Sequence, residues 1–218
     1  MKYIIATLIG NHKTYSIPKF FQRLNELIEQ PELLLISTTE EVYKLCPETT
    51  NMRHIQGEDD TGNDTIKSTT SARESIRQHS LNYMEMNPDV EWVLWLDNDI
   101  GVPPNLIERF RLYLEKKPNL VMVNSHHPAR QDGEELRHGM ACTFTHRDAL
   151  SAYPFTRASL RGANYGDDQI WLSVIGTLGR FTWRNNLESS GGIFFDVTHF
   201  VEDGREKNLP PHLRSDLL

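Results

Sequence analysis

The stretch WVLWLDND, residues 92–99, decides the fold, because a continuous apolar run ends abruptly at three polar residues. Five consecutive apolar residues are typical of a strand buried on both faces, at the centre of a parallel sheet. In open α/β sheets, ligands bind outside the carboxyl ends of such strands. The sequence therefore predicts that Asp97, Asn98 and Asp99 face a crevice at this edge of a sheet rather than the core.

Apolar runs and helical patterns alternate around this strand, which predicts an α/β domain with one mostly parallel, Rossmann-like sheet flanked by helices. Further strands are expected at residues 3–9, 33–37, 52–56, 120–124, 141–145 and 196–200, and helices at 17–29, 40–45, 105–116 and 147–152. The polar segment 57–71 is interpreted as a loop before a helix that starts at residue 71 or 72 and ends near residue 86. One domain is expected over residues 1–201, followed by a polar tail or flap at 202–218.

The composition limits the partners of this domain. Its 23 Lys and Arg face 30 Asp and Glu among 218 residues, and a formal charge of −7 argues against general nucleic-acid binding. No apolar stretch approaches the roughly 20 residues that span a bilayer, so no transmembrane segment is expected. The N-terminus lacks a signal-peptide pattern and Cys46 and Cys142 are far apart, so a cytoplasmic protein with two ordinary core cysteines is expected.

Three features could carry chemistry. Asp97 and Asp99 leave the strand one residue apart, so both can approach one Mg²⁺ or Mn²⁺, although a solvated turn is the simpler alternative. Asp167 and Asp168 open an apolar helix, where crowding would raise the pKa of one carboxyl toward that of a general base; capping of the helix is the alternative. His199 stands in a late strand, where a lone histidine is more often structural.

These pieces, in this order, resemble the metal-dependent glycosyltransferases of the GT-A fold, particularly glycosyltransferase family 2 and its relatives. The resemblance is carried by SARESI (residues 71–76), LWLDNDIGVPPNLI (94–107), GMACTFTHRDAL (139–150) and GDDQIW (166–171), and it covers about residues 1–200. The chain departs from the family at Glu74, where an Asn is usual, and at Asp167, where a Glu is usual. It has no Walker, GxGxxG or GxSxG motif.

The resemblance implies a role for each of these positions. Asp99 and Asp97, with His199, would bind Mn²⁺ or Mg²⁺ at the diphosphate of a nucleotide sugar, and Asp168, beside Asp167, would be the catalytic base. The remaining donor-binding positions would lie at the first strand end, in the loop after the third strand, at the helix start and beside the metal: Thr7, Ile9, Asn11, Glu58, Arg73, Asp97 and Asn98.

The sequence thus predicts a glycosyltransferase that moves a sugar from a UDP- or GDP-linked donor to a hydroxyl of a glycan, a lipid-linked acceptor or a protein, with inversion favoured. A phosphohydrolase of the haloacid-dehalogenase type is the alternative, because a DxD after an apolar strand and a later GDD also occur there. Against it, nearly a hundred residues precede the DxD, which usually lies near the start of such chains. A second alternative is a GT-A-like module that binds a nucleotide sugar without turnover.

Overall fold

A six-stranded sheet forms the centre of the molecule. In the computed structural model, the residues described are 1–57, 65–118, 120–125, 127–128, 136–137, 140–155, 158–160, 163–165 and 197–208. The strand order is β3-β2-β1-β4-β9-β6. The strands are β1 (Lys2–Leu8), β2 (Leu33–Thr38), β3 (Met52–Gln56), β4 (Val90–Leu96), β6 (Met122–Asn124) and β9 (Cys142–His146). Strands β1 to β4 are parallel and β9 runs antiparallel to both β4 and β6, so the predicted α/β class with a mostly parallel sheet is confirmed.

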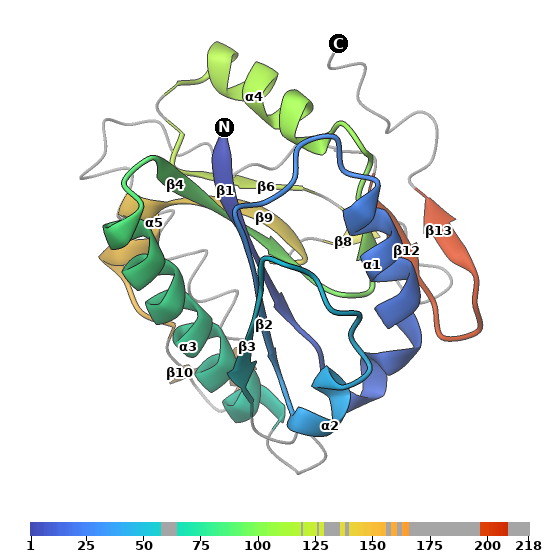
Figure 1. Cartoon of the computed structure of the whole chain (residues 1–218). Coiled ribbons are helices and arrows are strands. Elements are labelled where there is room, and N and C mark those ends of the chain that lie inside the picture. The colour runs from blue at the N-terminus through green and yellow to red at the C-terminus, as the bar shows by residue number, and fades with distance from the viewer. Residues whose placement is uncertain are drawn as a thin grey trace.

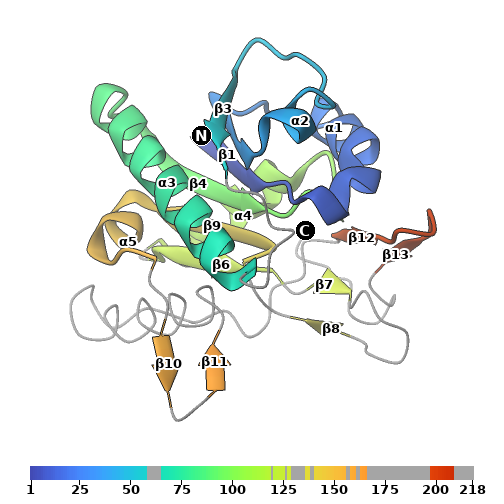
Figure 2. The ribbon, with the colours of Figure 1, turned by 90° about the horizontal axis from the view of Figure 1, so that it is seen from below.

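Helices cover both faces of this sheet (Figures 1 and 2). One layer holds α1 (Ile17–Asn25), α2 (Glu40–Tyr43) and α4 (Leu106–Lys116), which share a hydrophobic cluster with one face of the strands. The other layer holds α3 (Thr65–Met86) and α5 (Arg147–Ala152), which pack on the opposite face. None of the helices in the described part of the chain is both long enough and apolar enough to cross a membrane.

Strand β4 is central, as its apolar run predicts. Successive side chains of a strand point to opposite faces, so Trp92, Leu94 and Leu96 enter the cluster with α4 while Val93 and Trp95 enter the cluster with α3. All five are at most 6% exposed. Burying side chains of this size contributes about 2 kcal/mol each, and this fixes the point at which the polar residues 97–99 leave the sheet.

A second, three-stranded sheet lies beside that point, in the order β13-β12-β5. It consists of β5 (Ile100–Gly101), β12 (Thr198–Phe200) and β13 (Glu206–Asn208). Because His199 pairs with Ile100, the late strand lies directly next to the turn at residues 97–99. Residues 206–208 of the expected tail are a strand of this sheet, while residues 209–218 lie outside the described residues.

The remaining described strands form two short antiparallel pairs. Strand β7 (His127–Pro128) pairs with β8 (Leu136–Arg137). Strand β10 (Ala158–Leu160) pairs with β11 (Ala163–Tyr165). The segment expected to form a loop and helix after residue 166 lies outside the described residues.

Two helix boundaries differ from the sequence-based expectation by more than two residues. Helix α1 ends at Asn25 rather than at residue 29, because the Ile28 amide donates to the carbonyl of Pro104 (3.0 Å) and the Ile28 side chain is 73% exposed. Helix α3 begins at Thr65 rather than at residue 71 or 72. Its Ser- and Thr-rich start has weak helix propensity, but Ile76 and Met84 further along the same helix pack on the sheet and stabilise it.

Candidate functional site

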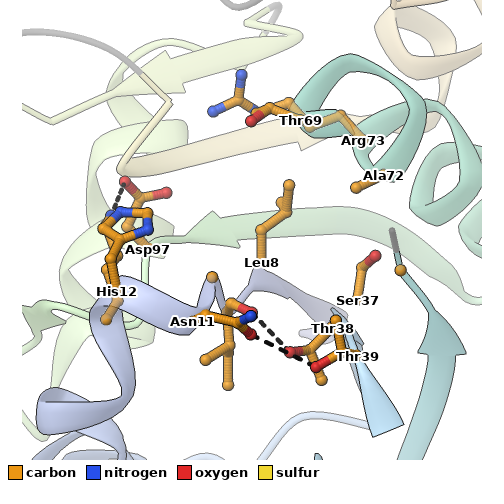
Figure 3. A pocket seen from close by; sticks show the side chains of 14 residues that line it. Leu8, Asn11, His12, Ser37, Thr38, Thr39, Thr69, Ala72, Arg73 and Asp97 are labelled. Carbon is orange, nitrogen blue, oxygen red and sulfur yellow. Dashed lines mark hydrogen bonds and ion pairs between the residues drawn. The ribbon is translucent and has the colours of Figure 1, made fainter. Parts of the chain in front are cut away.

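A pocket of about 230 Å³ opens at the carboxyl ends of β1 and β2, beside α3 (Figure 3). Its lining comes from residues 8–13 after β1, from residues 37–39 at the end of β2 with Gly57, from Thr69, Ala72 and Arg73 of α3, and from Asp97 after β4. This is the edge of the sheet at which open α/β folds bind ligands. A pocket that combines apolar walls with converging polar groups is the default ligand site of such a fold.

Hydrogen bonds between strand ends fix one wall of this pocket. The Thr38 hydroxyl donates to the Ile9 carbonyl (2.6 Å), and the Thr39 hydroxyl donates to Oδ1 of Asn11 (3.5 Å). The Gly57 amide donates to the Thr38 carbonyl (2.8 Å). A Cβ at residue 57 would lie 3.1 Å from the Thr38 backbone, so this close approach of two chain segments favours glycine.

Residues 97–99 converge on a single lysine. The Lys13 ammonium lies 3.3 Å from Oδ2 of Asp97 and 3.0 Å from Oδ1 of Asp99. The Asn98 amide donates to the Lys13 carbonyl (2.9 Å) and to the Ser16 hydroxyl (2.7 Å). Lys13 and Ser16 belong to the 3-10 turn η1 (Asn11–Ser16) between β1 and α1. The turn after β4 is therefore bonded to the turn after β1, and β1 and β4 are neighbouring strands of the sheet.

His199 approaches residues 97–99, the acidic turn, from β12. Its Nε2 lies 3.1 Å from Oδ2 of Asp99, and its Nδ1 lies 2.8 Å from the carbonyl of Pro128 in β7. Both partners are oxygen atoms that accept hydrogen bonds, so each ring nitrogen of His199 faces an acceptor. Asp99 and His199 are buried, and Lys13 and His199 occupy one carboxylate oxygen of Asp99 each.

A second histidine lies close to His199. The ring centroids of His127 and His199 are 6.0 Å apart. Burial lowers the pKa of His127 to about 4, against the opposing effect of the carboxylate of Asp97. The His127 imidazole is therefore neutral near pH 7, and it places a hydrogen-bonding but uncharged group beside the acidic turn.

Arg73 and Glu74, the two charged residues in the part of α3 that resembles the glycosyltransferase motif, make different contacts. Arg73 lines the pocket. Glu74 binds Arg77 through both carboxylate oxygens (2.7 Å each) and accepts the Phe155 amide (2.9 Å). Burial opposes ionisation of Glu74, but these hydrogen bonds outweigh it and hold its pKa below the usual range. Glu74 thus ties α3 to residue 155, whereas Arg73 remains beside the pocket.

The positions predicted for donor binding separate into three groups. Ile9, Asn11, Arg73 and Asp97 line the pocket. Thr7 is fully buried in β1 and is not among the lining residues, and Asn98 is fully buried with its amide committed to Lys13 and Ser16. Glu58 lies outside the described residues, as do Asp167 and Asp168, which were predicted as catalytic residues.

Sequence reasoning missed several residues of the site. Lys13, Thr38, Thr39 and Thr69 all line the pocket. Lys13 carried a usable signal, since a cation four residues after the first strand of a parallel sheet lies at the edge where the acidic turn was expected. What the sequence did not reveal is that β1 and β4 are neighbours.

The donor atoms at the acidic turn suit the divalent metal that the resemblance implies. Two carboxylates and an imidazole are ligands that Mn²⁺ accepts, and Mg²⁺ often binds through one or two carboxylates with water and phosphate. Within the described residues, however, no three acidic, histidine or cysteine side chains are arranged to hold a metal ion. The same two carboxylates hold the Lys13 ammonium instead.

Comparison with known proteins shows a likeness of fold. No protein-family model and no curated protein sequence matches it. The crystal structure of A197 from STIV is similar over 99% of this chain and 97% of that chain, with 11% identity and a TM-score of 0.51, a likeness of fold.

Other similar structures include glycosyltransferases. One is involved in the glycosylation of the major capsid of PBCV-1 (15% identity, 86% of this chain, 71% of that chain, TM-score 0.39). Another is S. aureus TarS 1–349 in complex with UDP-GlcNAc (12% identity, TM-score 0.49). The match covers 78% of this chain and 52% of the TarS chain.

Proposed function

We propose that this chain is a glycosyltransferase that moves a sugar from a UDP- or GDP-linked donor to a hydroxyl of a glycan, a lipid-linked acceptor or a protein. The observation that carries the proposal is the position of the pocket. It lies at the carboxyl ends of β1 and β2, with Arg73 in one wall and Asp97 of the acidic turn in another. Polar side chains can bind the base and ribose of a nucleotide, and a cationic side chain can bind its phosphates. The acidic turn would serve the donor through the divalent metal that it would hold.

Residues of three segments would each bind a different part of the donor. Asn11 and Thr39 are joined by a hydrogen bond at the wall formed by β1 and β2, and their amide and hydroxyl suit a nucleoside. Arg73 reaches the pocket from α3, and a guanidinium can bind phosphate oxygens in pairs. The acidic turn would then lie on the side of the diphosphate and the sugar.

Asp97 and Asp99, with His199, would hold Mn²⁺ or Mg²⁺ in this proposal. A divalent cation supplies Lewis-acid stabilisation of the charge that develops on a leaving diphosphate, worth several kcal/mol. Asp168 would take the proton of the acceptor hydroxyl as that oxygen attacks the anomeric carbon, with Asp167 beside it, in a single inverting displacement. General-base help of this kind contributes about 10²- to 10⁴-fold in rate.

Donor binding is the first test. The unfolding temperature of the purified chain is measured with UDP-, GDP- and dTDP-sugars, with and without Mn²⁺, because a ligand of the native state raises that temperature by mass action. One class of nucleotide sugar is expected to stabilise the chain, and Arg73→Met to weaken that effect at least tenfold in ligand concentration. Arg109→Met is the matched control, because Arg109 lies on α4 and binds Asn105. Absence of stabilisation by every nucleotide sugar would contradict the proposal.

Turnover separates the proposed enzyme from the alternatives. Asp99→Ala is expected to abolish metal-dependent donor binding, whereas Asp168→Asn is expected to retain donor binding and lose transfer. A fully active variant at either position would remove that residue from the mechanism. Release of phosphate from a simple phosphomonoester would favour the phosphohydrolase, and donor binding with neither transfer nor donor hydrolysis would favour a binding module.

A further inference from the structure

Three consecutive residues after β4 all contact one residue, Lys13. The carboxylates on either side, Asp97 and Asp99, contact its ammonium at 3.3 and 3.0 Å. The middle residue, Asn98, donates to its backbone carbonyl at 2.9 Å. All three residues of a motif that resembles a metal-binding DxD therefore contact a lysine of the same chain.

The fold holds Lys13 in this position. Its carbonyl also accepts from the Ser16 hydroxyl (2.8 Å), so two hydrogen bonds fix the backbone of η1 at this residue. The Lys13 side chain is only 16% exposed, whereas that of Lys44, which lies 3.9 Å from Glu40, is 67% exposed. A surface lysine loses rotamer freedom when it forms an ion pair, and this limits the gain. For Lys13 the tethered backbone and partial burial reduce that cost.

The acidic turn requires positive charge. The Asp99 side chain is 2% exposed, and a buried carboxylate without a partner is strongly destabilising. Its Oδ1 faces Lys13 and its Oδ2 faces His199. A divalent cation that bridges Oδ2 of Asp97 and Oδ1 of Asp99 would take the position that the ammonium now holds between these two oxygens.

We propose that the Lys13 ammonium is an intrinsic competitor of the divalent cation at this site, so that metal binds only as the ammonium leaves the carboxylates. The proposal rests on the proposed function for the identity of the metal site. Lys13 also lines the pocket, so a displaced ammonium remains beside the place where the donor diphosphate would bind. Metal and donor should therefore bind better together than separately, and this coupling is reciprocal.

Binding of Mn²⁺ alone to the nucleotide-free protein tests the competition. Calorimetry is used to compare the wild type with Lys13→Met, which keeps the length of the side chain and removes its charge, and with the matched control Lys44→Met. We expect Lys13→Met to bind Mn²⁺ at least tenfold more tightly than the wild type and Lys44→Met to match the wild type. An unchanged or weaker affinity of Lys13→Met, or no Mn²⁺ binding by either protein, overturns the inference.

A measurement on the wild type covers the case in which Lys13→Met does not fold. Reductive methylation of lysines, read by mass spectrometry after digestion, reports how accessible each amine is. Saturating Mn²⁺ should increase the methylation rate of Lys13 several-fold and leave that of Lys44 unchanged; an unchanged rate at Lys13 overturns the inference. Neither readout uses a nucleotide, so failure of all nucleotide sugars to bind would sink the proposed function and leave the competition measurable.

Discussion

Replacing Asn98 by alanine should destabilise the chain by about 2 kcal/mol, although sequence reasoning assigns this residue to donor binding. The side chain is fully buried, and its amide makes two hydrogen bonds, to the Lys13 carbonyl (2.9 Å) and the Ser16 hydroxyl (2.7 Å). Each such bond contributes about 1 kcal/mol net. Their loss removes the attachment between the turn after β4 and the turn after β1.

Two smaller effects nearly cancel. Truncation leaves a small void, which costs about 1 kcal/mol. It also removes Oδ1, a buried atom with no hydrogen-bond partner among the described residues, and this relieves a desolvation cost of about 1 kcal/mol. The Lys13 carbonyl keeps its bond from Ser16 (2.8 Å), so it is not left unsatisfied. The net loss of about 2 kcal/mol corresponds to a drop of about 4–8 °C in the unfolding temperature.

Urea denaturation followed by tryptophan fluorescence measures this loss, since Trp92 and Trp95 are buried in β4 directly before the turn. Asn98→Asp is the sharper variant, because it preserves shape but replaces the donating amide with a carboxylate opposite a carbonyl. It should destabilise the chain more than alanine does. The exposed Asn51 provides the control Asn51→Ala, with a change below about 0.5 kcal/mol. Wild-type stability of Asn98→Asp would refute the structural role assigned to this amide.

Three further predictions concern the surroundings of the site and the core. Gly101→Ala would place a Cβ 2.6 Å from Cζ of the buried Phe200, so thermal unfolding should show a loss of about 1–3 kcal/mol from overpacking. Burial lowers the pKa of His146 below 6.5 in the folded chain. The neutral imidazole therefore contributes its full stability above pH 6.5, and this contribution is lost as the pH falls through the pKa of the folded state. On acidification, the urea midpoint of His146→Gln should fall less than that of the wild type. Burial raises the pKa of Cys46 to about 11 and that of Cys142 to about 12, so mass spectrometry should find both thiols slow to react with iodoacetamide at about pH 8 until urea unfolds the chain.

The strands of the central sheet could be predicted because burial leaves a direct mark on composition. The apolar run at 92–96 predicted a strand buried on both faces, and this strand lies between β1 and β9 with side chains in both cores. Helix ends were harder to place. The apolar Ile28 continues the pattern of α1, yet it is exposed because its backbone is bonded to Pro104 after the chain has left the helix.

Some of the residues that line the pocket could be predicted from the sequence, but their arrangement could not. The abrupt change from apolar to acidic at residue 97 identified the edge of the sheet, and the end of the first strand supplied Ile9 and Asn11 to the pocket. The role of Lys13 depends on a pairing between β1 and β4 across more than 80 residues of chain. Local sequence patterns carry no information about that pairing, and so the cation opposite the acidic turn was missed.

Charge balance explains why the lysine matters for the interpretation of the motif. The carboxylates of Asp97 and Asp99 both face the ammonium of Lys13, and the carboxylate of Asp99 also faces the imidazole of His199. A divalent cation at the proposed site would add two positive charges and would leave Lys13 without its carboxylate partners. The donor diphosphate of the proposed function, bound in the adjoining pocket, would supply an anion for the displaced ammonium. If this acidic pair holds a divalent metal as proposed, its affinity for that metal would therefore depend on where the ammonium of Lys13 can go.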